Sequence, residues 1–283
     1  MNGFLVLDKP GGMTSRDALN RVQRWFPKRT KIGHTGTLDP LATGVLVVCI
    51  GAATRLADRI QAMPKSYDSR IRLGATSSTD DADGEIEVHS ATPPSREQLD
   101  AAIAEFIGTI DQLPPAFSAL KVGGRRAHDL ARKGENVPLA PRAVTITAIR
   151  LTQYEWPFVD VSIDCGKGTY IRSVARDLGE KLGVGGMVES LRRTRVGPFA
   201  AEFGVTLETG PDEARSRLQP MLAALAELPQ VSLTVDEERR FRQGQMIATH
   251  SGSGEAAVLG EHGDLIGIGG FDGGLHPRVV LNG

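Results

Sequence analysis

Apolar residues recur along the chain in two patterns that predict β-strands. Phe4–Leu7 and Val45–Ile50 are continuous apolar runs, each short enough to be a strand buried on both faces. Tyr67–Leu73 and Val159–Cys165 alternate apolar and polar residues, which indicates strands with one buried face. Val144–Tyr154 predicts another strand just before the second of these. The pattern therefore predicts at least one sizeable sheet.

Three other segments carry apolar residues at helical spacing. The first follows Ser15, a suitable N-cap, and ends at Pro27. The second follows the capping box Ser95–Gln98, and the third runs from Ile171 to Leu182. Strands and helices do not alternate in a regular βαβ repeat. The sequence therefore predicts an α+β fold and not a doubly wound parallel sheet.

Two long segments depart from these patterns. Residues 113–142 hold four prolines and two clusters of basic residues, and predict a long exposed loop of the kind that usually has a function. Residues 205–228 predict an acidic, helical connection, after which glycine becomes frequent and only short strands are predicted. We therefore expect a large domain over residues 1–228 and a small β-rich domain over residues 229–283.

The composition is that of a globular protein. The 283 residues are 40% hydrophobic and 24% charged, which provides for a large core and excludes intrinsic disorder. Met1–Asp8 lacks the features of a signal peptide, and Val45–Ile50, the longest apolar run, is far shorter than the roughly 20 residues that span a bilayer. We expect a cytoplasmic protein. Cys49 and Cys165 lie in apolar runs, so we expect buried reduced thiols and neither a disulfide nor a zinc site.

The net charge of −1 provides no long-range attraction to phosphate, but it hides blocks of opposite sign. Residues 16–31 hold six basic residues against one acid, and residues 120–133 hold five against one. Residues 79–105 hold eight acids against one basic residue, and residues 208–238 hold seven against two. Most charge runs are simply solvated surfaces. A local basic surface can still bind a polyanion, so we expect one basic and one acidic face.

The segment Gly33–Gly44 is the one most suggestive of chemistry. Its three glycines permit unusual backbone conformations and the close approach of a ligand. Pro40 restricts the preceding Asp39 to an extended conformation, so this carboxylate can be held and aimed. His34 adds a planar, hydrogen-bonding ring. The segment lacks the glycine patterns of phosphate-binding loops, and composition alone leaves open a structural turn capped by Asp39.

Residues 33–46, Gly-His-Thr-Gly-Thr-Leu-Asp-Pro-Leu-Ala-Thr-Gly-Val-Leu, closely resemble the catalytic loop of the bacterial tRNA pseudouridine synthase B family. Five further stretches resemble motifs of that family in the same order: Leu7–Ser15, Lys65–Tyr67 with Leu73–Gly74, Pro114–Lys121, Lys167–Arg172 and Leu191–Arg193. Residues 229–283 loosely resemble the family's C-terminal RNA-binding domain of PUA type. One departure is Phe117, where the family usually has tyrosine. This change removes a hydroxyl group and leaves stacking available.

The resemblance implies a catalytic domain with a mixed, largely antiparallel sheet flanked by helices, into which residues 113–142 insert as an RNA clamp. It implies isomerisation of the uridine at position 55 in the TΨC loop of tRNA, with the N1–C1′ bond broken and uracil rejoined through C5. It implies no cofactor and no metal. The expected partner is tRNA alone, bound by a monomer that needs no membrane and no obligatory protein.

The resemblance also assigns catalytic residues. Asp39 is the essential one, and an ionised Asp can attack C1′ as a nucleophile or remove the C2′ proton as a base; the sequence leaves both open. Arg172 is the expected ion-pair partner of Asp39, because an unpaired buried carboxylate would take up a proton. Tyr67 is expected to stack on the uracil base and is a candidate for removing the C5 proton.

The remaining assignments concern substrate and RNA binding. His34 matches the residue that fills the space left by the flipped base, where stacking is worth about 1–3 kcal/mol. Tyr170 and Leu191 match positions that line the uracil pocket. Lys9 and Lys121 are candidates either for phosphate contacts or for anchoring their own motifs. Further RNA-binding candidates are four arginines of the insertion and the last motif: Arg125, Arg126, Arg192 and Arg193.

Two other functions remain open at this point. One is a guide-RNA-dependent pseudouridine synthase of the archaeal and eukaryotic sister type, which shares the Asp loop. The absence of an N-terminal extension and the small C-terminal domain argue against it. The other is a tRNA-binding or folding module without catalytic activity. Activity on tRNA without a guide, and its dependence on Asp39, distinguish these functions.

Overall fold

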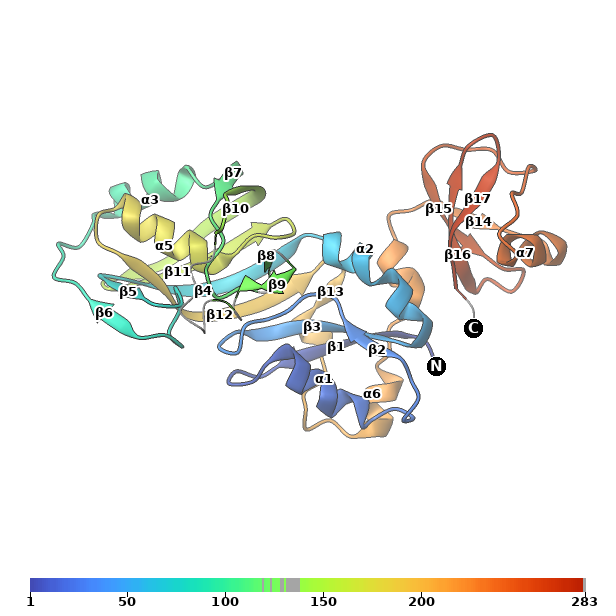
Figure 1. Cartoon of the computed structure of the whole chain (residues 1–283), viewed down its shortest axis with the longest axis horizontal. Helices are drawn as coiled ribbons and strands as arrows, with labels where there is room; N and C mark the ends of the chain where they lie inside the picture. The colour runs from blue at the N-terminus through green and yellow to red at the C-terminus, as the bar shows by residue number, and fades with distance from the viewer. Residues whose placement is uncertain (119, 123, 128–129, 131–137, 282–283) are drawn as a thin grey trace.

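The computed structural model describes residues 1–118, 120–122, 124–127, 130 and 138–281. Within them, nine strands form one mixed sheet whose main path is β1-β3-β12-β4-β11-β10-β7, with β2 on β3 and β13 on β12 (Figure 1). These strands are β1 (Gly3–Lys9), β2 (Ile32–His34), β3 (Thr43–Ile50), β4 (Lys65–Leu73), β7 (Gly108–Gln112), β10 (Arg142–Glu155), β11 (Phe158–Cys165), β12 (Gly186–Val196) and β13 (Phe199–Ala200). Among the described strands of this sheet, β3 and β12 form the one parallel pair. The predicted α+β fold with a largely antiparallel sheet is confirmed.

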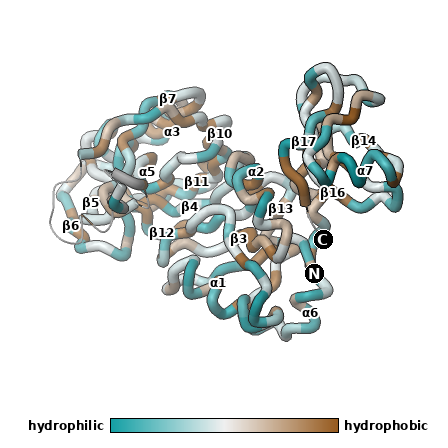
Figure 2. Tube along the Cα trace, turned by 45° about the vertical axis from the view of Figure 1, so that its right-hand side comes forward, coloured by the Kyte–Doolittle hydropathy of each residue, from teal (hydrophilic) through white to brown (hydrophobic). Residues whose placement is uncertain are grey.

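Helices α3 (Arg96–Ala104) and α5 (Ile171–Lys181) lie together on one face of this sheet (Figure 1). Both are amphipathic, and they bury apolar residues against the strands. The buried residues they contribute to this core include Leu99, Ile103, Ile171, Val174 and Leu178. The core continues to α1 (Ser15–Gln23), which Figure 2 shows as largely hydrophilic apart from its buried residues. All three helices therefore contribute to one core, and α5 begins on the face of the sheet that this core covers.

The start of α1 differs by one residue from the prediction. Thr14, and not Ser15, is the N-cap: its hydroxyl accepts from the Asp17 amide, and the Asp17 carboxylate accepts from the Thr14 amide. This reciprocal capping box satisfies two of the free donors at the helix start. Ser15 is thereby released for a contact elsewhere in the fold. The capping box predicted at Ser95 and Gln98 is confirmed at the start of α3.

The sequence predicted a loop over the whole of residues 113–142, and this prediction is wrong in part. It contains a short antiparallel hairpin of β8 (Lys121–Val122) and β9 (Arg125–Arg126), and its last residue begins β10. The expectation for positions 128–129 and 131–137 lies outside the described residues. Another small hairpin, β5 (Ala75–Ser77) with β6 (Ile86–Val88), follows β4.

The chain after residue 200 forms a connection and then a second sheet. The connection includes η2 (Ala201–Phe203), α6 (Pro211–Ser216) and η3 (Met221–Leu225), so the helical segment predicted there is interrupted. The second sheet has the order β14-β15-β16-β17. Its elements are β14 (Gln230–Ser232), α7 (Val235–Arg242), β15 (Glu255–Leu259), β16 (Leu265–Phe271) and β17 (Leu275–Val280). We refer to residues 229–281 as the C-terminal unit.

The C-terminal unit packs on the end of the molecule that bears η1 (Gly51–Leu56) and α2 (Ala57–Ala62) (Figure 1). One apolar cluster joins Leu56 and Ile60 to Ile268 and Leu281 of this unit. The Arg55 guanidinium donates to the Val280 carbonyl at 2.6 Å, and Arg59 forms an ion pair with Glu255. Across the described ranges, no helix has the length and apolarity needed to cross a membrane.

Candidate active site

The loop between β2 and β3 carries Asp39 and is held from behind by residues of β1 and α1. The Lys9 ammonium group, fully buried, donates to the carbonyl oxygens of Pro10, Met13 and Pro40, the last at 3.4 Å. The Ser15 hydroxyl donates to the Leu38 carbonyl at 3.0 Å and accepts from the Leu38 amide at 2.8 Å. Lys9 therefore anchors its motif, and the alternative expectation of a phosphate contact is not met, because the side chain has no access to the surface.

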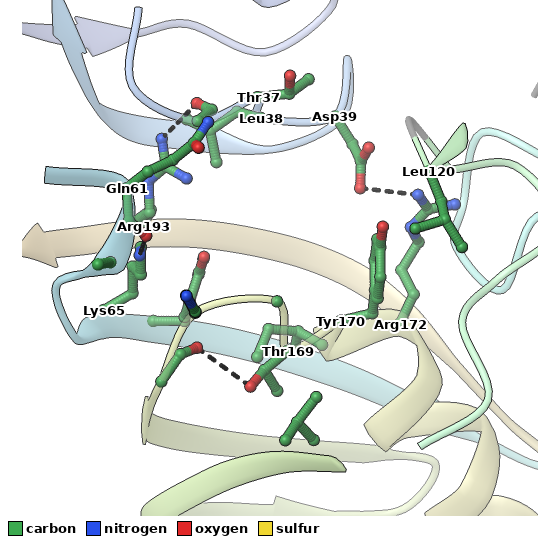
Figure 3. Close-up of a pocket in the computed structure, with 18 of the residues that line it drawn as sticks. Thr37, Leu38, Asp39, Gln61, Lys65, Leu120, Thr169, Tyr170, Arg172 and Arg193 are labelled. Carbon is green, nitrogen blue, oxygen red and sulfur yellow. Dashed lines mark hydrogen bonds and ion pairs between the residues drawn. The ribbon is translucent and has the colours of Figure 1, made fainter. Parts of the chain in front are cut away.

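Asp39 and Arg172 form the ion pair that the resemblance predicts. Arg172 Nη2 lies 3.0 Å from Asp39 Oδ2, at the start of α5 (Figure 3). The Arg172 side chain is 4% exposed, whereas that of Asp39 is 34% exposed. Two carbonyl groups orient the guanidinium: it donates to Thr79 at 2.8 Å and to Phe117 at 2.9 Å. The contact with residue 117 uses the main chain, so it does not depend on the phenylalanine that departs from the family pattern.

A second carboxylate, Asp81, shares Arg172 with Asp39. Its Oδ2 lies 3.4 Å from Arg172 Nε, and its side chain is 5% exposed. Asp83 Oδ2 accepts from the Leu41 amide at 3.2 Å, which ties the same acidic segment to the Asp39 loop. Sequence reasoning missed both residues because they lie in an acidic run that resembled a solvated surface. Only the fold brings this run to the site.

The surroundings of Asp39 push its ionisation in opposite directions. Burial raises the pKa of Asp39 above its ordinary value, the Arg172 guanidinium opposes this rise, and the negative charge of Asp81 adds to it. Burial likewise raises the pKa of Asp80, whose carboxylate pairs with Arg176 at 3.1 Å. A carboxylate that is incompletely solvated and paired with one guanidinium is suited to act as a nucleophile or a base.

A cavity of about 830 Å³ opens in front of Asp39. This volume is in the range of small-ligand sites. Four of the residues that the resemblance assigns to catalysis or to the uracil pocket line it with Asp39: Tyr67, Arg172, Tyr170 and Leu191. They come from β4, α5, the N-cap of α5 and β12. The structure thus brings together residues that are more than a hundred positions apart in the sequence.

Several cationic side chains also line this cavity, and most were not singled out by the sequence. Arg142, at the start of β10, places its guanidinium carbon 5.1 Å from the centre of the Tyr170 ring. Lys65 donates to the carbonyl groups of Gln61 and Met63, and burial lowers its pKa to about 8. Lys167 and Arg193 complete the set. A cavity with this lining is suited to a polar, anionic ligand. Among the described residues, no group of three or more His, Cys, Asp or Glu side chains could hold a metal ion.

Other predicted RNA-binding residues lie outside this cavity or behind its wall. His34 ends β2, directly before the Asp39 loop, and does not line the cavity. Arg192 forms a two-point ion pair with Asp8, at 2.9 and 2.7 Å. Arg125 is exposed in the β8–β9 hairpin, whereas the side chains of Lys121 and Arg126 lie outside what the structure describes.

The basic residues of segment 16–31 form an exposed cluster on α1 and the turn after it. These residues are Arg16, Arg21, Arg24, Lys28, Arg29 and Lys31, and none pairs with a carboxylate of the described chain within 4.0 Å. The expectation of separate basic and acidic faces is wrong in one respect. Asp80, Asp81 and Asp83, from the most acidic block, lie at the site and balance its arginines.

Comparison with known proteins agrees with the resemblance seen in the sequence. Three family descriptions match in succession: "TruB family pseudouridylate synthase (N terminal domain)" over residues 24–171, "tRNA pseudouridylate synthase B C-terminal domain" over residues 172–226, and "Pseudouridine synthase II TruB, C-terminal" over residues 229–281. A fold and a site of this kind define an RNA-modifying isomerase. The chain belongs to the TruB family of pseudouridylate synthases.

Two curated relatives match along the whole chain. A protein of Cereibacter sphaeroides (strain ATCC 17023) named tRNA pseudouridine synthase B is 43% identical over 100% of this chain and 97% of its own length. One of Ruegeria sp. (strain TM1040) with the same name is 44% identical over 100% of this chain and 96% of its own length. Among solved structures, a Cbf5–Nop10–Gar1 complex contains a chain that is 27% identical, with a TM-score of 0.74 over 98% of this chain and 83% of that one.

Proposed function

We propose that this protein isomerises uridine to pseudouridine at position 55, in the TΨC loop of tRNA, with Asp39 as the catalytic group. The observation that carries the proposal is the Asp39–Arg172 ion pair at the edge of a cavity of about 830 Å³, which Tyr67, Tyr170 and Leu191 also line. Full-length relatives named tRNA pseudouridine synthase B support the choice of substrate.

The chemistry requires that one bond is broken and another formed at the same sugar carbon. The N1–C1′ bond of uridine breaks, uracil turns within the cavity, C5 bonds to C1′, and the C5 proton is transferred to N1. The reactant and the product have the same atoms, so no oxidant, reductant or group donor is consumed. Asp39 either attacks C1′ or removes the C2′ proton. The ion pair with Arg172 keeps the carboxylate available for either role despite its burial.

Base recognition falls to the side chains facing Asp39 across the cavity. Tyr67, on β4, lines the cavity with an aromatic ring for stacking, and its hydroxyl group is the candidate base for the C5 proton. Tyr170 and Leu191 close the apolar sides of the uracil pocket. The uridine must leave the stacked loop, at a cost of a few kcal/mol, and His34 is the candidate to stack in its place.

RNA binding draws on surfaces around the cavity. The exposed cations of segment 16–31 adjoin β2 and therefore His34, and Arg125 is exposed on the β8–β9 hairpin. Arg126, its neighbour in sequence, remains a candidate for the same contact. We assign residues 1–228 to catalysis, with 113–142 as a clamp, and residues 229–283 to a PUA-like RNA-binding domain. Recognition of the stem-loop by shape, stacking and backbone contacts is usual for folded RNA. The reaction belongs in the cytoplasm, where tRNA is modified.

The decisive experiment uses the purified chain and an unmodified tRNA transcript, with no guide RNA and no other protein. Mapping pseudouridine along the product should show conversion at position 55 only. Conversion only after addition of a guide RNA and protein partners would favour the guide-dependent alternative. The structural likeness to the Cbf5 chain establishes a shared fold and leaves that outcome to experiment.

An Asp39→Asn variant tests the catalytic assignment. The amide keeps the shape of the side chain and removes its charge, so turnover should be lost while tRNA binding persists. Asp68→Asn, an exposed change on β4, is the matched control and should keep wild-type turnover. Pseudouridine formation at a normal rate by Asp39→Asn would refute the mechanism, and a chain that binds tRNA but never converts it would be a binding module.

A further inference from the structure

Arg193 is as buried as Arg172 in the cavity wall, and its position does not suit the RNA contact expected from the sequence. It lies on β12, and its side chain is 4% exposed. Figure 3 shows it across the cavity from Arg172, on the side of Thr37 and Lys65. A guanidinium buried to this extent can be reached only from inside the cavity, and not by a phosphate that stays on the outer surface of the protein. Its use must be sought in the groups that it contacts inside the protein.

The Arg193 guanidinium lies against three segments of the chain. Nε donates to the Val45 carbonyl at 2.8 Å, and Nη2 donates to the Gly36 carbonyl at 3.1 Å. The third segment is β4, where Tyr67 lies directly opposite Arg193 and where the guanidinium acts to lower the pKa of the Tyr67 phenol. Gly36 belongs to the loop of Asp39, Val45 to β3, and Tyr67 to β4. One side chain therefore links the Asp39 loop to the tyrosine that faces it.

The main chain of Arg193 strengthens this link. In the sheet, Arg193 pairs with Tyr67 in the antiparallel register of β4 and with Gly44 in the parallel register of β3. Its side chain and backbone thus contact the same two strands. A displacement of Arg193 would move the tyrosine and the Asp39 loop relative to each other.

Arg193 has no carboxylate within 4.0 Å in the described part of the chain. Burying a cation without an opposite charge costs several kcal/mol, and neutral acceptors compensate for it only in part. A neutral side chain could donate to the same carbonyl groups at a smaller cost. The charge therefore has a use beyond holding the fold, and the Tyr67 phenol, directly opposite in β4, is a group whose ionisation it affects.

We propose that Arg193 is a positioning residue for the reaction. It fixes the Tyr67 hydroxyl and the Asp39 loop so that both can act on the same bound nucleotide. This assignment rests on the proposed function. Instead of the expected contact with an RNA phosphate, Arg193 contacts protein groups on the two sides of the cavity. It acts through Tyr67 and does not touch the reacting atoms itself.

The electrostatics of Tyr67 agree with this geometry. Burial raises the pKa of Tyr67, and the Arg193 guanidinium opposes that rise. Cys165 on β11 and Asp39 in the facing loop are the other titratable groups near the hydroxyl, and both act to raise its pKa. Arg193 is thus the group near Tyr67 that favours its ionised form.

The test compares Arg193→Gln and Arg193→Lys with Arg195→Gln, an exposed arginine on the same strand. Single-turnover rates on a tRNA transcript should fall about 100-fold for R193Q and about tenfold for R193K, because a misplacement of about 1 Å has effects of this size. The Kd for tRNA should change less than threefold. R195Q should keep the wild-type rate. A weakened Kd with an unchanged rate constant for R193Q would restore the RNA-binding role and overturn the proposal.

Coupling to Tyr67 gives a second criterion. In a Tyr67→Phe background, R193Q should cost about tenfold in place of about 100-fold, because the effect on the Tyr67 hydroxyl is already removed while the contacts with Gly36 and Val45 remain. An undiminished 100-fold loss in that background would show that Arg193 acts by another route. Urea unfolding of each variant identifies any that lose activity by unfolding, and the more conservative R193K then carries the comparison.

A measurement that does not depend on turnover distinguishes a failure of this proposal from a failure of the proposed function. The chain has three tyrosines, so ¹³C-labelling their ring Cζ atoms gives three signals, and Tyr67→Phe assigns the one of interest. R193Q should shift the Tyr67 signal and leave those of Tyr154 and Tyr170 in place. An unmoved Tyr67 signal would contradict the contact with Arg193. A shifted signal in a chain that forms no pseudouridine would contradict the function and leave the contact established.

Discussion

Replacement of Gly44 by alanine should destabilise the large sheet much more than an ordinary glycine-to-alanine change. Gly44 is in β3 where this strand runs parallel to β12, and its φ is +98°. A methyl group added there would lie 2.1 Å from the Arg193 carbonyl oxygen and 3.0 Å from the Arg193 nitrogen. These are backbone atoms of the paired strand, so no side chain can turn away to make room.

Two costs combine at this position. Holding an L-residue at positive φ costs about 1–2 kcal/mol. Relief of the contact requires β3 and β12 to separate by about 1 Å or more, and forced overpacking of this kind costs a further 1–3 kcal/mol or so. We therefore expect Gly44→Ala to lower the free energy of unfolding by about 2–5 kcal/mol. Gly183→Ala, after α5, is the control: φ is +69° and nothing lies within 4 Å of the added methyl, so only the backbone cost of about 1–2 kcal/mol applies.

Urea unfolding followed by tryptophan fluorescence measures this difference. The two tryptophans, Trp25 and Trp156, both pack on the core of the large sheet, so the signal reports that part of the molecule. The midpoint should fall much further for Gly44→Ala than for Gly183→Ala. Equal shifts would mean that β3 and β12 do not approach as closely as described. The position given for Arg193 beside Gly44 would then be wrong as well.

Three more substitutions or treatments test other parts of the site. Arg172→Gln removes the charge that opposes the rise of the Asp39 pKa, so this pKa should rise further. The acid limb of the single-turnover pH profile should then move to higher pH. An unmoved limb would contradict the pairing of Asp39 with Arg172. Ser15→Ala removes both contacts with the Asp39 loop and should lower the rate about tenfold at unchanged tRNA affinity, the equivalent of about 1.4 kcal/mol; a wild-type rate would show that the loop needs no such anchor. Burial raises the pKa of Cys49 to about 12 and that of Cys165 to about 11, so a thiol reagent at pH 8 should modify neither in the native chain and both in urea.

The strands were predictable because their burial is visible in local composition. Val45–Ile50 is apolar at every position, and the structure buries all of it within β3. Tyr67–Leu73 alternates, and Tyr67, Ser69, Ile71 and Leu73 are the buried positions of β4, as expected. Such patterns indicate which positions of a strand are buried and which are exposed to solvent. The short β8–β9 hairpin has no comparable pattern, so residues 113–142 looked like a loop.

The candidate site was predictable only where a motif carried it. The resemblance pointed to Asp39 and Arg172, and the structure places them in contact. Asp81 was missed because nothing local distinguishes it from its acidic neighbours: its role depends on a contact with a helix about ninety residues further along. Arg193 was assigned to RNA because it is one of two adjacent arginines in the last motif. Adjacent positive charges suggest exposure, whereas the burial of Arg193 results from the pairing of β12 with β3 and β4, which the local sequence does not show.

The Asp39 loop is fixed by its carbonyl groups, which turn into the protein while the carboxylate turns out. Arg193 binds the carbonyl of Gly36, Ser15 that of Leu38, and Lys9 that of Pro40. The three anchors come from β12, α1 and β1, so movement of the loop would disturb three elements together. Two of them are buried cations that need those carbonyl groups as much as the loop needs them. Loop geometry and sheet stability are therefore coupled, and a substitution at any anchor should change the rate and the unfolding free energy together.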